Sequence, residues 1–277
     1  MAEIVYSEGF YKQNVKSSTP SSLTILGMLR DLYEWKSVVD FGCGSGAWLA
    51  GAEAHGGEEL YGFDGPWVDP TKITSPNIAF TPMDFEKELP SLDKKVDLAI
   101  SVEVAEHLFK DRVDAFFDAF CTMADVVVFS AAIPYQGGTH HVNEQPQSYW
   151  IEHFDRRGFD VFDIFRPHIW NDDDVRWWFR QNVFLFVRRG SDAIDRTKLA
   201  ELESPLRDVV HPVNYVRKIR LNKERIKQLE AEVESLEKAI IAAAKAPAAA
   251  APPAPTIGDK VDRVARGVKR RVKALRS

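Results

Sequence analysis

Short apolar runs alternate with amphipathic stretches over the first 190 residues of the chain. The runs are nearly all apolar and rich in β-branched and aromatic side chains, which is typical of strands covered on both faces. They occupy residues 37–41, 59–64, 77–83, 96–102, 125–133, 159–165 and 182–189, and helices are expected at 21–35, 46–55, 111–123 and 146–157. This alternation predicts an α/β fold with a seven-stranded doubly wound sheet. Since no long helix separates the last two strands, an antiparallel pair is expected at one edge.

A different periodicity follows this first region, which spans residues 1–190. Residues 191–214 form a polar connector, 215–245 repeat apolar side chains in heptads, 246–255 contain only Ala and Pro, and 256–277 are basic. The heptad a positions are Ile219, Ile226, Val233 and Ile240, and the d positions are Tyr215, Leu229, Leu236 and Ala243, with Asn222 as the polar exception. We predict a coiled coil that forms a homo-oligomer. β-Branched a residues with Leu at d favour a parallel dimer, while a trimer or a solitary solvated helix stays open.

Charge is distributed unevenly between the body and the tail. The net charge is −5, but residues 256–277 hold eight Lys or Arg and two Asp, which leaves −11 for residues 1–255. An acidic body is a poor partner for nucleic acid, because phosphate contacts need basic side chains. The tail repeats its apolar residues with a mean step of one helical turn, which predicts a basic amphipathic helix for peripheral contact with an anionic membrane.

The remaining composition indicates a cytoplasmic protein. Cys43 and Cys121 are too few for a disulfide framework or a Cys-rich zinc site, and they suit a reducing compartment. No apolar run reaches the roughly 18 residues that a membrane span needs, and the N-terminus lacks the apolar region of a signal peptide. We therefore expect a cytoplasmic location, with peripheral binding at the inner membrane surface through the tail.

A glycine-rich turn follows the first predicted strand in the run Asp40-Phe41-Gly42-Cys43-Gly44-Ser45-Gly46. Glycines let a ligand approach the backbone, and the next helix offers free N–H groups at its start. Asp64 ends the second predicted strand, where an acid commonly binds ribose hydroxyls. The glycines alone satisfy a dinucleotide-binding pattern as well, so they do not separate NAD from other adenosine ligands. Asp40 favours a ligand with an ammonium group, because it would repel a diphosphate.

The run from Asp40 to Gly46 resembles the acid-x-Gly-x-Gly-x-Gly signature of class I S-adenosylmethionine (SAM) methyltransferases. Further matches are Asp64, the segment TPMDFEKELP and the fourth-strand segment VDLAISVEVAEHL, so the resemblance covers about residues 35–190. It implies a Rossmann-like methyltransferase fold with SAM as the cofactor. It also implies a role for each matched residue: Asp40 faces the methionine end, Gly42 and Gly44 lie against the cofactor, Asp64 holds the ribose, and Asp84 and Phe85 hold the adenine. Asp84 alternatively caps a helix that begins at EKEL.

Carboxylates and imidazoles follow the fourth and fifth predicted strands. Glu103, Glu106 and His107 have helical spacing, and His141 lies in the segment GGTHHVNE after the fifth strand. The carboxyl ends of both strands should meet at one cleft, where such groups can bind Mg²⁺, Mn²⁺ or Zn²⁺.

The set Glu103, Glu106, His107 and His141 resembles the metal sites of small-RNA 3′-terminal 2′-O-methyltransferases and of ubiquinone-pathway O-methyltransferases. His141 is preferred to His140 because its spacing to Glu144 fits those families. The resemblance implies that Glu103, His107 and His141 act in catalysis, with a metal that makes an acceptor hydroxyl a better nucleophile. A Glu-His pair also occurs in metal-free class I methyltransferases, so a base-only His107 and a purely structural role stay open.

The order of methyltransferase domain, coiled coil and basic end resembles that of bacterial O-polysaccharide chain-terminating methyltransferases. We therefore expect a SAM-dependent O-methyltransferase (EC 2.1.1.-) that acts on a hydroxyl of a saccharide, a polysaccharide or a related polar acceptor, with a divalent metal. One alternative is RNA 3′-terminal 2′-O-methylation, which the acidic body disfavours. Others are a metal-free small-molecule methyltransferase with His107 as its base, and a degenerate scaffold, which the intact motifs disfavour.

Overall fold

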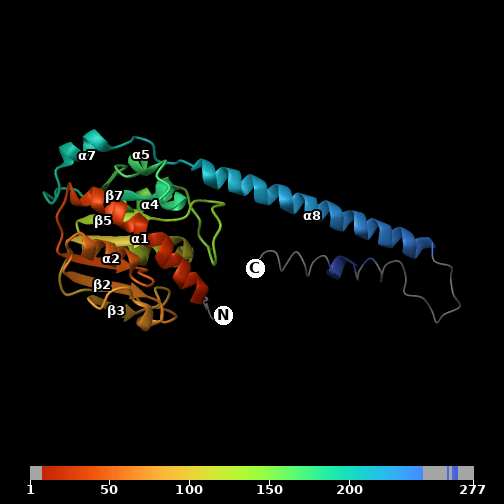
Figure 1. The fold of residues 1–277 in the computed structure, drawn as a ribbon, viewed down its shortest axis with the longest axis horizontal. Coiled ribbons are helices and arrows are strands. Elements are labelled where there is room, and N and C mark those ends of the chain that lie inside the picture. Colours follow the sequence, from red (N-terminus) through yellow and green to blue (C-terminus); the bar gives the residue numbers. More distant parts are fainter. Residues whose placement is uncertain (1–7, 246–260, 262–263, 268–277) are drawn as a thin grey trace. The chain divides into compact units, whose positions relative to one another are not determined.

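The structure is a computed structural model that describes residues 8–245, 261 and 264–267 (Figure 1). The chain divides into two compact units, residues 1–221 and residues 222–277. The expected Ala/Pro linker and most of the expected amphipathic tail lie outside the described residues. Among the described helices, none is both long and apolar enough to cross a membrane.

A seven-stranded sheet forms the centre of the first unit. Its strands are β1 (Ser37–Phe41), β2 (Glu59–Asp64), β3 (Ile78–Pro82), β4 (Leu98–Val102), β5 (Val126–Ser130), β6 (Phe159–Phe162) and β7 (Phe184–Arg188). Their order is β3-β2-β1-β4-β5-β7-β6, and β7 runs antiparallel to both of its neighbours. The predicted α/β fold is confirmed, with a Rossmann-like sheet and an antiparallel pair at its edge.

The longer helices agree with the sequence pattern better than the short ones do. The structure has α1 (Glu8–Arg30), α2 (Ala47–Ala54), α3 (Lys110–Met123) and α4 (Gln147–Asp155) near the four expected positions. The expectation of a helix at 21–35 was wrong at both ends, because α1 continues through Pro20 on one side and stops at Arg30 on the other. Arg30 then donates from Nη1 to the carbonyl of Trp35 at 3.1 Å, across the turn that follows the helix.

Further helices are too short to show a periodicity in the sequence. They are α5 (Arg166–Ile169), α6 (Trp177–Asn182) and α7 (Arg196–Leu202), with 3₁₀ turns η1 (Pro70–Lys72) and η2 (Ala105–His107). The expected irregular connector therefore contains α7, which begins where the Asp195 carboxylate accepts the Thr197 N–H at 2.9 Å. The helix α8 (Pro212–Lys245) is 34 residues long and covers the heptads. Its pairing as a coiled coil stays a prediction.

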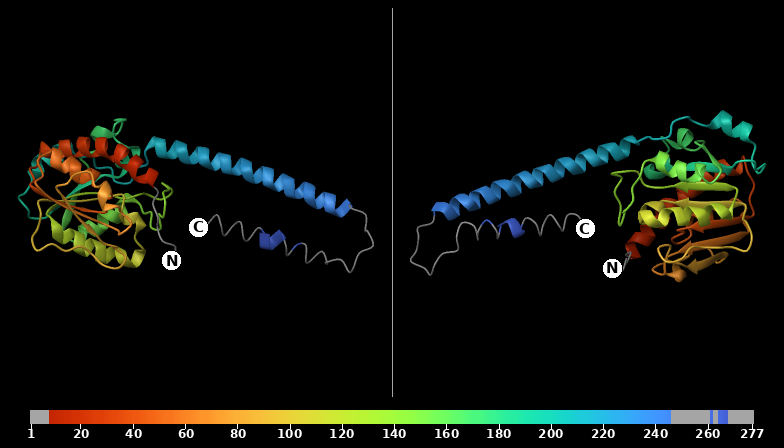
Figure 2. Two further views of the ribbon diagram at one scale, coloured as in Figure 1. Left: turned by 60° about the horizontal axis from the view of Figure 1, so that its bottom comes forward. Right: turned by 180° about the vertical axis from the view of Figure 1, so that it is seen from behind.

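Helices cover both faces of the sheet (Figure 2), and an apolar core lies under each layer of helices. Along β1, Val38 belongs to the core under α1 and α2, whereas Val39 and Phe41 belong to the core under α3 and α4. This alternation follows from the two-residue period of a strand. Because both faces are covered, polar chemistry is left to the ends of the strands, where the loops begin.

Candidate active site

The predicted site residues lie at or after the carboxyl ends of the parallel strands β1 to β5. β1 pairs with β2 on one side and with β4 on the other, so the strand order reverses at β1. Ligands of open α/β sheets bind at such a switch point, outside the carboxyl ends of the strands. The topology therefore brings the glycine turn after β1 close to the acidic segment after β4.

Gly42 holds these two segments together. Its φ is +86°, and its N–H donates to the carbonyl of Phe63 at 2.7 Å. A Cβ added at Gly42 would lie 2.2 Å from Cγ2 of Val104, so only glycine permits this approach. Gly44 has a φ of +54°, and an added Cβ would meet no atom within 4 Å. One glycine is thus required by packing, while the other faces open space.

Two acids, Asp40 and Asp64, lie beside the glycine turn and differ in their hydrogen bonds. Asp40 is fully buried on β1, and neither carboxylate oxygen has a hydrogen-bond partner among the described residues. Burial, followed by the neighbouring charge of Asp64, raises its pKa well above the ordinary value. The Asp64 carboxylate accepts the N–H groups of Gly44 at 2.7 Å and Gly65 at 2.6 Å, although burial still raises its pKa. A cationic group beside Asp40 would relieve the cost of burying its charge.

Asp84 and Phe85 follow β3 and have local partners. Asp84 accepts the Glu86 N–H at 3.1 Å and forms an ion pair with Lys87 at 2.7 Å. The ring of Phe85 is buried, with its centroid 5.7 Å from that of Phe41. The structure therefore places Asp84 as the residue that forms a turn and Phe85 in the core beneath the glycine turn.

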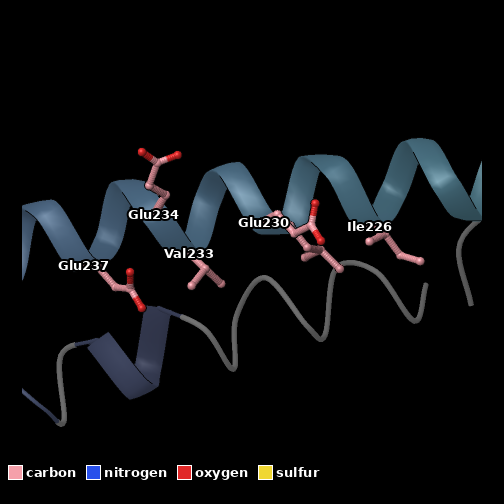
Figure 3. Close-up of a pocket in the computed structure, with 6 residues that line it drawn as sticks. Ile226, Glu230, Val233, Glu234 and Glu237 are labelled. Carbon is pink, nitrogen blue, oxygen red and sulfur yellow. The ribbon is translucent and has the colours of Figure 1, made fainter.

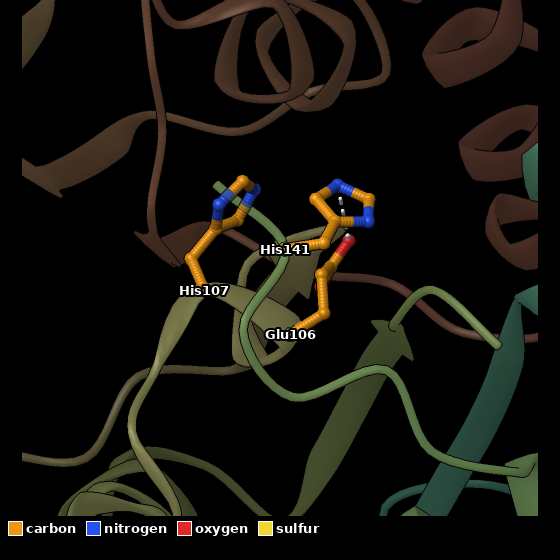
Figure 4. Close-up of side chains that lie close together, drawn as sticks. All are labelled: Glu106, His107 and His141. Carbon is orange, nitrogen blue, oxygen red and sulfur yellow. Dashed lines mark ion pairs between the residues drawn. The ribbon is translucent and has the colours of Figure 1, made fainter. Parts of the chain in front are cut away.

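Glu106, His107 and His141 form one cluster (Figure 4). Glu106 and His107 lie on η2 after β4, and His141 lies on the loop after β5. One ligand atom from each residue lies within 4.8 Å of the others, and His141 Nε2 is 3.9 Å from Glu106 Oε1. The carbonyl of Glu106 accepts the N–H groups of Val142 at 3.0 Å and Asn143 at 2.9 Å, which ties the two segments together.

Hydrogen bonds orient both imidazoles of the cluster. His107 Nδ1 lies 3.2 Å from the carbonyl oxygen of His140, and His141 Nδ1 lies 3.0 Å from Glu144 Oε1. An acceptor oxygen at Nδ1 places the proton there and leaves the lone pair on Nε2. Metal-binding histidines are held in this way, by a carbonyl or carboxylate on the nitrogen that does not bind the ion.

The electrostatics of the cluster also suit a cation. The carboxylate of Glu106 is fully buried, and neither oxygen has a hydrogen-bond partner among the described residues. Burial, with the neighbouring charge of Glu103, raises the pKa of Glu106 well above its ordinary value, although the nearby backbone N–H groups of Glu106 and Ala132, beyond hydrogen-bonding geometry, oppose that shift. Burial and the adjacent His141 lower the pKa of His107 to about 4. At neutral pH His107 is therefore a neutral ligand, beside an acid that has no hydrogen-bond partner among the described residues.

Glu103 lies next to this cluster in sequence but is engaged elsewhere. Its carboxylate accepts hydrogen bonds from Ser130 Oγ at 2.9 Å, Gln136 Nε2 at 2.7 Å and Asn182 Nδ2 at 3.1 Å. Burial raises its pKa, and these donors oppose that shift. Its φ of +55° is uncommon for a residue with a side chain, so the turn after β4 is held by its contacts. The structure thus brings three of the four predicted metal ligands together and places the fourth beside them.

Sequence reasoning missed the residues that hold the site in place. Gln136 and Asn182 bind Glu103, and a Cβ added at Gly138 would lie 2.1 Å from His141 Nε2. The sequence offered a signal for Gly138, since it stands in the GGTHH segment, and none for Asn182, which is remote from every motif. Glu144, by contrast, has the contact with His141 that its spacing indicated.

Comparisons with known proteins agree with this topology. The profile of a methyltransferase domain family matches residues 25–182, and no curated protein matches at the significance threshold applied. An O-methyltransferase family protein from Burkholderia thailandensis is 12% identical with a TM-score of 0.50, covering 67% of this chain and 60% of that one. The small RNA methyltransferase HEN1 is 15% identical with a TM-score of 0.44, and the match covers 69% of this chain and 27% of that one. A chain in a complex of the Haloferax volcanii Trm112 methyltransferase activator with a methyltransferase is 18% identical with a TM-score of 0.47. The match covers 65% of this chain and 94% of that one.

At 12% identity and a TM-score of 0.50, the Burkholderia structure indicates a shared fold only. The chain spans less than two thirds of the length of the Burkholderia protein and about a quarter of that of HEN1. The family profile, however, covers more than half of this chain, from α1 to the end of α6, and includes the glycine turn and the Glu-His-His cluster. The chain belongs to the methyltransferase domain family.

Proposed function

We propose that this chain is a SAM-dependent O-methyltransferase that methylates a hydroxyl of a saccharide, a polysaccharide or a related polar acceptor, with the assistance of a divalent metal. One observation carries the proposal. Among the described residues, neither the buried carboxylate of Asp40, on β1, nor that of Glu106, on the turn η2 after the neighbouring strand β4, has a hydrogen-bond partner. Each is suited to a cationic partner, and the two partners would be an ammonium group and a metal ion.

The residues around the glycine turn fit SAM. Asp40 would pair with the ammonium of the methionine end, Gly42 and Gly44 would lie against the cofactor, and Asp64 would hold the ribose hydroxyls. Asp84 and Phe85 would hold the adenine. When bound, SAM supplies an electrophilic methyl group. The chain's own contribution is to place an acceptor oxygen in line with it, which can supply much of the rate.

The Glu106, His107 and His141 cluster fits Mg²⁺, Mn²⁺ or Zn²⁺, since it combines a carboxylate with two oriented imidazoles. A bound ion would lower the pKa of an acceptor hydroxyl. Glu103 would hold the neighbouring turn in position, and its charge acts on His141 across the cluster. The exposed ring of Tyr135, on the loop that carries His141, offers a stacking surface for a sugar.

Two further functions are distinguished by the same site. A metal-free enzyme would use His107 as its general base, but a pKa of about 4 makes it a weak base near neutral pH and a good neutral ligand. RNA 2′-O-methylation would use the same cluster, yet residues 1–255 carry a balance of −11. Neither alternative accounts for the charge distribution and the orientation of both imidazoles as well as the metal-assisted reaction on an uncharged acceptor does.

Calorimetry on three proteins tests the proposal. We expect wild type to bind S-adenosylhomocysteine and Mn²⁺, Asp40→Asn to lose at least tenfold in affinity for the first ligand only, and His141→Ala to lose at least tenfold for the second only. Binding of NAD without S-adenosylhomocysteine would contradict the cofactor assignment. Methyl transfer to a panel of sugars, polyols and short RNAs then identifies the acceptor. Full activity after dialysis against EDTA would leave His107 as the base.

A further inference from the structure

The heptad face of α8 is exposed along its length. Its apolar side chains are 38–63% exposed: Tyr215, Ile219, Ile226, Leu229, Val233, Leu236 and Ile240. A hollow lies beside the helix, and the described residues that line it all belong to α8; Ile226 and Val233 point to the same side of the helix (Figure 3). A regular apolar stripe of this length is expected to be covered by another helix.

Charge changes sign along the same helix. Residues 217–227 contain six Lys or Arg and one Glu, whereas residues 228–238 contain four Glu and one Lys. Two copies that run in the same direction would place like charges opposite each other. Two copies that run in opposite directions would place the basic half of each helix against the acidic half of the other.

We propose that a second copy of this chain pairs with α8 in antiparallel orientation, centred between residues 227 and 228. In this register, every a position faces a d position of the other helix. Ile226 faces the partner's Leu229, Ile219 faces the partner's Leu236, and Tyr215 faces the partner's Ile240. Asn222, the one polar core residue, faces the partner's Val233. Seven of the eight core residues that these layers use are therefore apolar.

The flanking charges agree with this orientation. Reversing one helix brings e positions opposite e positions and g opposite g, so Lys223 faces the partner's Glu230 and Arg225 faces the partner's Glu232. By symmetry each attraction occurs twice, and no charged pair in this register repels. A parallel dimer would gain one attraction, between Arg225 and the partner's Glu230, but it would place Lys218 against the partner's Lys223 and Glu232 against the partner's Glu237, both repulsive. The shapes of the core residues favour a parallel dimer, but the charges favour the antiparallel one.

Reversal of one charge separates the two orientations. Lys223→Glu should weaken the antiparallel dimer about tenfold, because two attractions become repulsions, and should strengthen a parallel dimer. The double variant Lys223→Glu with Glu230→Lys restores the antiparallel pair. Lys227→Glu makes the same charge change at an exposed b position and should leave the dissociation constant unchanged. Sedimentation of the full-length chain at several concentrations measures all four proteins.

Electron-spin distances give an independent test. A label at Lys238→Cys would lie opposite the partner's Arg217, so the two labels would be about 31 Å apart along the helix axis. In a parallel dimer they would lie side by side. The native Cys43 and Cys121 are buried, which limits labelling to the new site. A monomer at every concentration, as expected if residues 256–277 cover the face instead, would overturn the proposal, as would tighter association of Lys223→Glu or a short distance between labels.

Discussion

Replacing Gln136 with Leu tests whether buried amides hold the loop that carries His141. Gln136 is 4% exposed, and its Nε2 donates to Glu103 Oε2 at 2.7 Å. Its Oε1 accepts from Gln181 Nε2 at 3.0 Å, from Asn182 Nδ2 at 2.8 Å and from the Ile133 N–H at 3.4 Å. Leu nearly conserves the volume of the side chain and removes all four bonds, so the change isolates the polar network from the packing.

The bonds lost allow an approximate calculation of the cost. A hydrogen bond to a carboxylate contributes about 2 kcal/mol, and the two neutral bonds to Gln181 and Asn182 contribute about 1 kcal/mol each. The bond from the Ile133 N–H is long, at 3.4 Å, and is not counted. The added apolar groups of Leu regain about 1 kcal/mol through burial. The net loss in free energy of unfolding is therefore about 3 kcal/mol, or about 9 °C in the melting temperature of a unit of this size.

Urea and thermal unfolding measure this loss, with Gln145→Leu as the matched control. Gln145 is a partly exposed residue of the same loop with one side-chain hydrogen bond, from Nε2 to Asn143 Oδ1 at 2.9 Å. We expect a loss below about 1 kcal/mol for the control. Equal losses for the two variants, or a loss for Gln136→Leu below about 1 kcal/mol, would refute the assignment of the network.

Three other changes give further expected outcomes. Gly138→Ala should displace the imidazole of His141 and lower Mn²⁺ affinity at least tenfold without changing S-adenosylhomocysteine affinity, as calorimetry would show; unchanged Mn²⁺ binding would contradict the packing argument. As the pH rises from 4 to 7, the free energy of unfolding should fall less for Asp40→Asn than for wild type. The folded-state pKa of Asp40 is raised, so the unfolded chain releases a proton that the folded chain retains, and wild-type stability falls as the pH rises. If the free energy of unfolding depended on pH in the same way for both proteins, the buried charge of Asp40 would not cost stability. Deleting residues 256–277 should abolish sedimentation with anionic vesicles, and tail-independent binding would exclude the proposed contact.

Local patterns in the sequence determined the sheet and the position of the site. Apolar runs indicated all seven strands, and they were clearest for β1, β4 and β5, which are buried along their whole length. The Gly42 turn was identified by its neighbours in sequence. The segments after β4 and β5 were expected to share a cleft because parallel strands end at one edge of a sheet. Each of these inferences depends on residues that are close together in the chain or on a general rule of topology.

Only the tertiary structure decided how the side chains of the site divide their roles. Glu103 is held by Gln136 and by Asn182, which comes 79 positions later in the chain, so its separation from the cluster depends on contacts that no local spacing encodes. Gly138 is required by the position of the His141 ring, not by its own backbone. The short helices α5 to α7 were also missed, since a few turns supply too few positions for a periodicity. Periodicity therefore determines the elements and their order, whereas long-range packing determines which groups are satisfied and which are left for a ligand.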